Sequence, residues 1–246
     1  MKKKRIAIDA DFIVFQCTEG KEHTQGTFDN EKVKLKPFKE KFRAIVRDIE
    51  EEVAVEFLGV YKIKGKAKIL LSDPAGNFRY DIFPNYKANR KGSTRSELFY
   101  RLRKWALKEY GYTPNIEADD EAGYLAGTGK YIVCSMDKDV LKSTAGDHFD
   151  VYHSRRGRVT TSELEARNFT LLQTVMGDPT DGIIGIPRVG ERTAIKLLDE
   201  HGWNWKGVLL SYKAKGLTDA DALLNRRLVD LHQWSPNKGV KLWVRK

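Results

Sequence analysis

The sequence predicts an α/β fold in which a central, mostly parallel sheet is flanked by helices and followed by a C-terminal helical region. Two observations support this prediction. Three short apolar runs each lead into an aspartate, namely Asp9, Asp73 and Asp137, as expected of buried parallel strands. The segments between and after these runs have helical periodicity. We therefore expect residues 1–162 to form an α/β core and residues 163–246 a helical subdomain with a basic tail.

The three predicted strands share one design, an apolar run that ends in an acid. They are Arg5–Asp9, Lys68–Asp73 and Tyr131–Asp137. In open α/β sheets, sites form outside the carboxyl ends of the strands, so the three acids are expected to converge on one crevice. One such aspartate is ordinary turn chemistry, whereas three together indicate a site.

A dense group of carboxylates follows at Glu117, Asp119 and Asp120. If Glu117 opens a helix, steps of about 100° per residue put Glu117 and Asp120 on one side and Asp119 just around the corner. The opposite side is apolar and forms the core face through Ala118, Ala122 and Leu125. A solvated face is the alternative for this triplet, because the helix dipole favours acids at a helix N-terminus.

The remaining elements are assigned from periodicity. Residues 19–36 are polar without a clear period, so we expect a loop or a small hairpin there. Short strands are expected at Phe149–His153 and Arg158–Thr160. Amphipathic helices are predicted at Pro37–Phe57, Glu163–Met176, Arg192–Glu200 and Asp219–Leu231.

Residues 84–108 form the most basic segment of the chain, with eight Lys or Arg and a single acid, Glu97. Thr94 and Glu97 predict a capping box for a helix that runs to Glu109. A charge run is usually a solvated face. This one lies between two acid-bearing elements and includes Tyr86, so phosphate contacts with a base stacked on an aromatic ring are the specific alternative.

A glycine-rich turn occupies residues 177–190 and precedes a predicted helix. Such a turn exposes backbone N–H groups at a helix N-terminus, which is a ready phosphate site. Glycines in a helical hairpin are commonly only turn residues. Asp178 and Asp181 favour the functional interpretation because they add two carboxylates beside the turn.

The amino-acid composition indicates which class of partner the protein binds. Lys and Arg total 44 against 34 Asp and Glu, which gives a formal net charge of +10. A basic chain with local acidic clusters indicates a polyanion partner and a cation-dependent site. No apolar run approaches the ~18 residues of a membrane span, and residues 1–5 lead into a strand rather than a signal peptide, so we expect a cytoplasmic protein without a membrane partner. Cys17 and Cys134 are expected to be buried and unpaired.

The ligand type indicates the metal. Aspartates and glutamates without histidine or cysteine in ligand spacing suit Mg²⁺ or Mn²⁺ rather than zinc. So many like charges in one crevice would raise each other's pKa values unless cations neutralise them. Two Mg²⁺ ions about 4 Å apart can activate a water and stabilise the leaving oxygen in phosphodiester cleavage.

Taken in order, these motifs resemble the 5′-nuclease or flap-endonuclease superfamily, which includes the 5′-exonuclease domain of bacterial DNA polymerase I. The resemblance covers residues 5–202 and is most similar to the stand-alone 5′-3′ exonucleases of tailed phages. It rests on Ile-Ala-Ile-Asp9, Asp73 with Phe78-Arg79, Tyr86-Lys87-x-x-Arg90, Glu117-Ala-Asp-Asp120, Asp137-Lys-Asp139, Gly177-Asp-x-x-Asp181 and Gly185-Ile-x-x-Val-Gly190. It implies a PIN-like core with a helix-hairpin-helix type DNA-binding subdomain, in the host cytoplasm if the protein is phage-encoded.

The resemblance also implies residue roles. One metal ion would be bound by Asp9, Asp73, Glu117, Asp119 and Asp120, and a second by Asp137, Asp139, Asp178 and Asp181. Lys87 and Arg90 would steady the scissile phosphate, and Asp9, Asp73, Asp120 and Asp137 would count with them as catalytic. Tyr86 would stack on a terminal base, and the turn at 182–190 is a candidate K⁺ site. The remaining DNA contacts would be Arg79, Lys91, Gly185, Arg188, Gly190, Arg192 and Lys196.

We therefore expect a monomeric, metal-dependent 5′-3′ exodeoxyribonuclease with flap-endonuclease activity. Its substrate would be duplex or branched DNA with a 5′ end, with RNA/DNA hybrids as a further candidate. One alternative is a DNA-binding module of the same fold without catalysis, which would leave clustered charge without a cation. Another is a PIN-type ribonuclease, which would need neither the turn at 177–190 nor the basic segment at 84–108.

Overall fold

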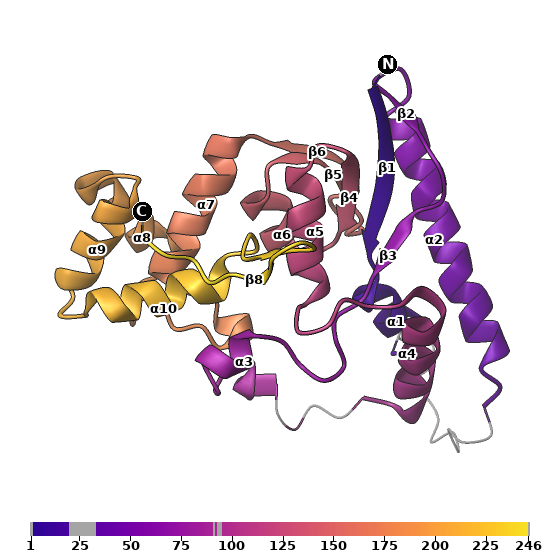
Figure 1. Cartoon of the computed structure of the whole chain (residues 1–246), viewed down its shortest axis with the longest axis horizontal. Coiled ribbons are helices and arrows are strands. Elements are labelled where there is room, and N and C mark those ends of the chain that lie inside the picture. The colour runs from indigo at the N-terminus through magenta and orange to yellow at the C-terminus, as the bar shows by residue number, and fades with distance from the viewer. Residues whose placement is uncertain (1, 20–32, 91, 93–94, 246) are drawn as a thin grey trace.

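The computed structural model describes residues 2–19, 33–90, 92 and 95–245. It confirms the α/β prediction, with a mostly parallel sheet between layers of helices and a helical region beside it (Figure 1). The strands are β1 (Lys2–Asp9), β2 (Tyr61–Ile63), β3 (Lys68–Leu70), β4 (Tyr131–Ser135), β5 (Gly146–Asp150), β6 (Gly157–Thr161), β7 (Trp234–Ser235) and β8 (Gly239–Val240). The longer helices are α1 (Asp11–Thr18), α2 (Lys36–Glu56), α4 (Glu97–Tyr110), α5 (Ala118–Gly127), α6 (Lys138–Ser143), α7 (Glu163–Met176), α8 (Glu191–His201), α9 (Trp205–Lys213) and α10 (Asp219–Val229). Short helical turns are α3 (Arg79–Ile82), η2 (Ala88–Arg90) and η3 (Pro179–Asp181).

The main sheet has the strand order β2-β1-β4-β5-β6, and β3 also pairs with β1. Every pair in it is parallel except the β5–β6 hairpin. β2 and β3 pair with opposite ends of β1, at Lys2–Lys4 and at Ala7–Asp9. The carboxyl ends of β1, β3 and β4 therefore lie at one edge, which is where a parallel sheet places its sites.

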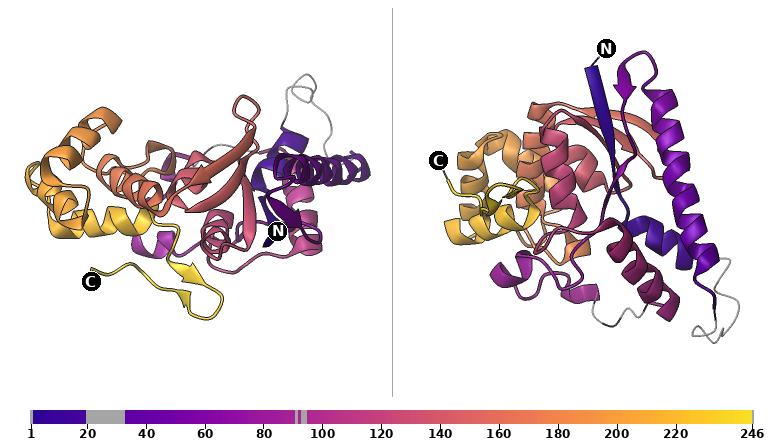
Figure 2. Two further views of the ribbon diagram at one scale, coloured as in Figure 1. Left: turned by 90° about the horizontal axis from the view of Figure 1, so that it is seen from above. Right: turned by 45° about the vertical axis from the view of Figure 1, so that its right-hand side comes forward.

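Side chains of β1 alternate between the two faces of the sheet, as the period of two requires. Ile6 and Ile8 pack into the core beneath α1, α2 and α4, whereas Ala7 faces the core beneath α5 and α6. The views of Figure 2 show α2 on one side of the sheet and α5 on the other. α2 buries Phe42, Ile49 and Val53, each worth about 1.5–3 kcal/mol on burial.

The helices α7 to α10 share their own apolar cluster, drawn from residues 171–222 with partly buried neighbours around it. Ser162 and Thr218 begin α7 and α10 with capping boxes, so both helix starts are fixed by the local sequence. The predicted helix at Glu163–Met176 is confirmed with the same bounds. After α10 the chain returns toward α5, where Gly123 leaves room for the backbone of Leu231, since a Cβ there would lie 2.8 Å from its oxygen.

Several local predictions need correction. β3 ends at Leu70 and not at Asp73, because the chain leaves the sheet after pairing with Asp9 of β1. The cap of α4 is Ser96, whose Oγ accepts the N–H of Phe99 at 3.1 Å. The predicted capping box of Thr94 and Glu97 is therefore wrong, and Thr94 itself lies outside the described residues.

Periodicity did not predict α1, α3, α6, α9, β2 or the β7–β8 hairpin, all of which are short. Most of the loop predicted at 19–36 falls in residues 20–32, outside the described ranges. Cys17 and Cys134 are buried and free, as predicted. Within the described ranges, no helix combines the length and apolar character needed to cross a membrane.

Candidate active site

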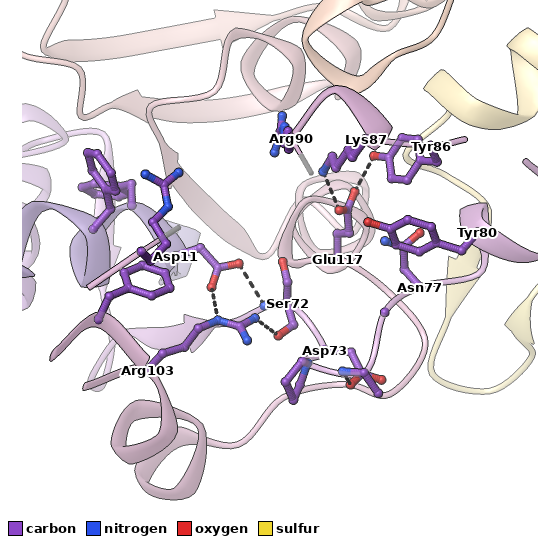
Figure 3. A pocket seen from close by; sticks show the side chains of 17 residues that line it. Asp11, Ser72, Asp73, Asn77, Tyr80, Tyr86, Lys87, Arg90, Arg103 and Glu117 are labelled. Atoms are coloured by element: carbon purple, nitrogen blue, oxygen red, sulfur yellow. Dashed lines mark hydrogen bonds and ion pairs between the residues drawn. The ribbon is translucent and has the colours of Figure 1, made fainter. Parts of the chain in front are cut away.

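Two cavities lie at the carboxyl edge of the sheet. The smaller, of about 30 Å³, is the acid crevice, lined by Glu117, Asp119, Asp137, Asp139, Asp178 and Asp181 together with Arg79, Tyr86, Gln173, Ile183, Leu228, Val229 and Leu231. The larger, of about 850 Å³, is the arch pocket, which shares Tyr86 and Glu117 with the crevice. Figure 3 shows the arch pocket, with Glu117 on one side and Arg103 on the other. Six of the nine predicted metal ligands thus meet in one cavity.

Asp9 joins this group from the end of β1. It is buried, and its Oδ2 accepts a hydrogen bond from the Ser135 hydroxyl at 3.0 Å. Its charge acts on the crevice, because it raises the pKa of Asp119 after the larger effect of burial. Seven of the nine predicted ligands therefore interact with one another, and they come from segments spread over about 170 residues of sequence.

Local turn structure fixes the acids from the second half of the chain. Asp137 caps α6 and accepts the N–H of Asp139 at 2.7 Å. Asp178 caps η3 and accepts the N–H of Thr180 at 2.8 Å. Gly177 brings Asp178 into place, because a Cβ at position 177 would lie 2.3 Å from the oxygen of Ile183, and its φ of 76° also favours glycine.

The acids of the crevice repel one another. Burial, and then the charges of neighbouring acids, raise the pKa of Asp139 to about 7 and that of Asp9 to about 7. The same causes raise the pKa of Asp137, and that of Asp119 well above its usual range. Raised pKa values mean that the ionised forms of these carboxylates are destabilised. A positive charge bound among them would stabilise the ionised forms.

Two residues of the basic segment predicted at 84–108 supply part of that charge. Lys87 Nζ lies 2.5 Å from Glu117 Oε1 and 3.4 Å from Asp181 Oδ2, and Arg90 pairs with the other oxygen of Asp181. Burial alone would lower the pKa of Lys87, but Glu117 and Asp181 raise it above its usual value. Burial would likewise raise the pKa of Glu117, yet Lys87 and Arg79 lower it. The predicted convergence of Lys87 and Arg90 is present, although η2 begins only at Ala88 and Lys87 has a left-handed φ of 53°.

Arg79 and Asp120 are placed differently from their predicted roles. Arg79 is 1% exposed and donates from Nη1 and Nη2 to both carboxylate oxygens of Asp120, at 2.8 and 2.7 Å. Its Nε donates to the Leu228 carbonyl at 2.8 Å. The prediction that Arg79 contacts DNA is corrected, because the side chain is buried. Asp120 is fully buried, and its carboxylate accepts hydrogen bonds from Arg79 and from the N–H of Glu117. These bonds occupy both carboxylate oxygens, so the arrangement does not match the predicted role of Asp120 as a metal ligand.

Tyr86 also differs from its predicted role. Its ring is buried, at 2% exposed, and its hydroxyl lies 2.8 Å from both Glu117 Oε2 and Asp181 Oδ2. A base cannot stack on a ring covered on both faces, so the stacking prediction is corrected for this conformation. Figure 3 shows Tyr86 and Lys87 reaching Glu117 together.

Asp73 does not reach the acid crevice. Its carboxylate accepts the N–H of Ala75 at 2.8 Å and that of Asn115 at 2.7 Å, and it lines the arch pocket. The physical reason is the early end of β3, which leaves Asp73 in a turn beyond the sheet. Its metal-binding and catalytic roles therefore stay predictions.

The predicted DNA-binding turn precedes α8, and Gly190 is the N-cap residue of that helix. Three basic side chains are exposed around it, namely Arg188, Arg192 and Lys196. The prediction that Gly185 contacts DNA is corrected. This residue is buried, and its N–H donates to Asn225 Oδ1 at 3.0 Å instead of facing outward. Lys91 lies outside the described residues.

Sequence reasoning missed several residues around these cavities. Gln173 lines the acid crevice, and Asp11, Arg95 and Arg103 line the arch pocket. Arg103 donates to the Ser72 carbonyl at 2.8 Å and lies 3.8 Å from Asp11. The position of Asp11 two residues after Asp9 was an available signal, whereas Gln173 had none, since it lies within an ordinary helical pattern.

The acid crevice suits hard divalent cations. Its donors are carboxylates, and Asp139 Oδ1 is buried without a hydrogen-bond partner, so its acceptor capacity is unused. No three acidic, histidine or cysteine side chains of the described residues already have the arrangement of a finished metal site. In this conformation Lys87 and Tyr86 donate hydrogen bonds to Glu117, so the Glu117 carboxylate is paired with these side chains.

The amino-acid sequence is similar to those of known exonucleases. The chain is 30% identical over 158 residues to a 5′-3′ exonuclease of Buchnera aphidicola, an alignment that covers 57% of this chain and 54% of the relative. It is 32% identical over 143 residues to the exodeoxyribonuclease of enterobacteria phage T3, covering 52% of this chain and 45% of the relative. Over about half of its length, the chain is therefore similar in sequence to 5′-3′ exonucleases. No family model matches it.

Structure comparison shows a related fold. The bacteriophage T5 flap endonuclease, solved in a complex with DNA and metal ions, has a TM-score of 0.67 and 18% sequence identity to the chain. That superposition covers 94% of this chain and 90% of the T5 protein. In sequence, the chain spans only about half the length of the two exonucleases, with 54% and 45% of them covered.

Proposed function

We propose that the protein is a metal-dependent 5′-3′ exodeoxyribonuclease with flap-endonuclease activity, which hydrolyses phosphodiester bonds near the 5′ ends of duplex DNA. One observation carries this proposal. Buried acids with raised pKa values line one crevice, and the Lys87 ammonium group, which belongs to the neighbouring arch pocket, pairs with Glu117 and Asp181 of that crevice. A site that holds cations and a mobile basic group side by side suits phosphoryl transfer. The named exonuclease relatives support the same reaction class.

The proposed cofactor is a pair of Mg²⁺ ions, for which Mn²⁺ would substitute. Asp9, Glu117 and Asp119 would bind one ion. Asp137, Asp139, Asp178 and Asp181 would bind the other. Cations bound there would supply Lewis-acid charge and would make water acidic enough to act as a nucleophile near neutral pH. The carboxylates of this chain contribute by neutralising those cations and fixing their positions.

Lys87 and Arg90 would bind the scissile phosphate. Both now pair with Asp181, so a phosphate that enters the crevice can take over the same donors while cations take over the acids. Arg90 offers a bidentate fork, and Lys87 a mobile point charge. The arch pocket would receive the unpaired 5′ strand, since Arg95 lies 4.7 Å over the ring of Phe15, which is 42% exposed, and such a cation and aromatic pair suits single strands.

Duplex binding is assigned to the helical region. We infer that residues 163–246 bind the duplex and that residues 1–162 form the nuclease core, to whose acid crevice the helical region adds Asp178 and Asp181. Arg188, Arg192 and Lys196 are exposed beside the N-terminus of α8, where backbone N–H groups and basic side chains suit phosphates. The 182–190 turn would also bind K⁺. The enzyme would accept RNA/DNA hybrids as further substrates and would act as a monomer.

A single assay tests this function. We expect 5′-labelled duplex and 5′-flap DNA to be cleaved with Mg²⁺ and left intact with EDTA, and an RNA/DNA hybrid to be cleaved as well. DNA binding without cleavage under any of these metal conditions would favour the DNA-binding module instead. Cleavage confined to single-stranded RNA would favour a PIN-type ribonuclease.

The arch residue Lys87 allows positioning to be separated from binding. We expect Lys87→Ala to lower the single-turnover cleavage rate on the order of 10²-fold and to leave DNA affinity nearly unchanged, because other phosphate contacts remain. The matched variants Arg188→Ala and Lys196→Ala should weaken binding and keep the rate at saturating DNA. Single-turnover rates and dissociation constants for all three variants check this. A loss of affinity alone in Lys87→Ala would assign the residue to the general basic surface.

A further inference from the structure

The acid crevice contains a neutral side chain that no motif singles out. Gln173 lies on α7, is 3% exposed, and lines the crevice with Asp137, Asp139 and Asp178. Its Oε1 is buried and has no hydrogen-bond partner. A buried acceptor left without a donor lowers stability, so this amide oxygen requires an explanation.

A second unpartnered acceptor lies in the same cavity. Asp139 Oδ1 is also buried without a hydrogen-bond partner. While Asp139 is ionised, neither of these oxygens can donate a hydrogen bond to the other, so the cavity favours a species that attracts both, either a cation or a water. Its volume of about 30 Å³ holds one or two species of that size. The surrounding acids favour the cation, and amide oxygens are accepted ligands for hard divalent ions.

The backbone presents Gln173 rigidly. Its carbonyl accepts the N–H of Gly177 at 2.7 Å, and Tyr212 donates from its hydroxyl to the neighbouring Thr174 carbonyl at 2.6 Å. Gly177 in turn packs directly against the backbone of Ile183 and leads into Asp178. The backbone of residues 173–178 therefore holds the Gln173 and Asp178 side chains in fixed positions relative to each other. This is what two ligands of one cation require.

We propose that Gln173 supplies a neutral oxygen to the coordination shell of a divalent cation bound by Asp137, Asp139 and Asp178. The inference deepens the proposed function and rests on its metal dependence. The amide completes the shell without adding a further negative charge to a crevice that already holds several. In the metal-free protein the same oxygen has no partner, so the side chain lowers stability until the cation binds.

Metal binding without DNA tests this, in EDTA-treated protein titrated with Mn²⁺ by calorimetry and followed by thermal unfolding. Gln173→Met keeps the size of the side chain and removes the amide. We expect it to raise the unfolding temperature of the metal-free protein. At the same time, it should weaken one Mn²⁺ site on the order of 10-fold or more, the scale seen when groups that support a metal are removed.

Asn168 provides a matched control. It lies on the same helix, and its Oδ1 is also buried without a partner, but it does not line the acid crevice. Asn168→Leu should therefore raise the unfolding temperature of the metal-free protein and leave Mn²⁺ affinity unchanged. Gln173→Glu should keep or strengthen Mn²⁺ binding and lower metal-free stability, because a carboxylate replaces the neutral oxygen among like charges.

The outcomes separate the two proposals. Equal Mn²⁺ affinity in wild type and Gln173→Met would overturn the inference, since the amide would then serve only a water. Weaker binding in Gln173→Glu would also overturn it, because it would make the amide a hydrogen-bond donor to the acids. If wild type binds no Mn²⁺ at all, the metal-dependent nuclease itself fails, whatever the variants do.

Discussion

Asp119→Asn is expected to remove most metal-dependent cleavage while it stabilises the metal-free protein. Asp119 is held in the acid crevice, where burial raises its pKa well above the usual range and the charges of Asp9 and Asp137 raise it further. The substitution removes one of these repelling charges, so the protein without metal gains stability. It also removes a charge that neutralises a cation, so the cleavage rate should fall by at least about 10²-fold, the scale of losing one electrostatic contact to a reacting phosphate.

The measurements are single-turnover cleavage of 5′-labelled duplex with Mg²⁺ and thermal unfolding in EDTA. Asp137→Asn should behave in the same way, because its pKa is raised by burial and by neighbouring acids as well. Asp48→Asn is the control, since Asp48 is exposed on α2 away from the crevice. Cleavage by Asp119→Asn near the wild-type rate would show that this acid does not support the cation.

Arg79→Met is expected to cause the largest loss of folding stability. The Arg79 and Asp120 side chains are 1% and 0% exposed and form a bidentate ion pair. Removal of the arginine leaves the aspartate charge buried without compensation, which lowers the free energy of unfolding by about 3–5 kcal/mol. The carbonyl of Leu228 also loses its donor, so the contact between α3 and the end of α10 weakens.

Urea unfolding of three proteins checks this expectation. The double variant Arg79→Met with Asp120→Leu should recover much of the loss, because a buried ion pair can be replaced by apolar side chains at little cost. Arg43→Met is the matched control, since the Arg43 and Glu109 side chains are each more than 40% exposed and water screens their pair, which should contribute little to stability. A loss in Arg79→Met no larger than in Arg43→Met would contradict the buried-pair argument.

Sequence reasoning was most successful where short-range pattern determines the outcome. The apolar spacing of α2 and α7 fixed both helices nearly to the residue, because each buries a stripe set by the helical period alone. Of the seven predicted ligands that interact in the structure, Asp9 and Asp137 lie together because the parallel strands β1 and β4 end at a common edge. The acids are also turn and cap residues, so Asp137 and Asp178 are placed by their own local backbone.

Tertiary structure alone decided which side chain faces which partner. Arg79, Asp120 and Tyr86 belong to the same sequence motifs as the crevice residues, yet they are buried in pairs with one another or with Glu117. The bonds of Arg79 join residues 41 and 149 positions apart, and no local pattern encodes such distances. Gln173 became visible only through an unpartnered oxygen in a cavity. The sequence by itself determined the acids, the sheet edge and the long amphipathic helices. Burial and pairing depend on long-range packing, which decides whether a polar group lies in water, against a partner or in a site.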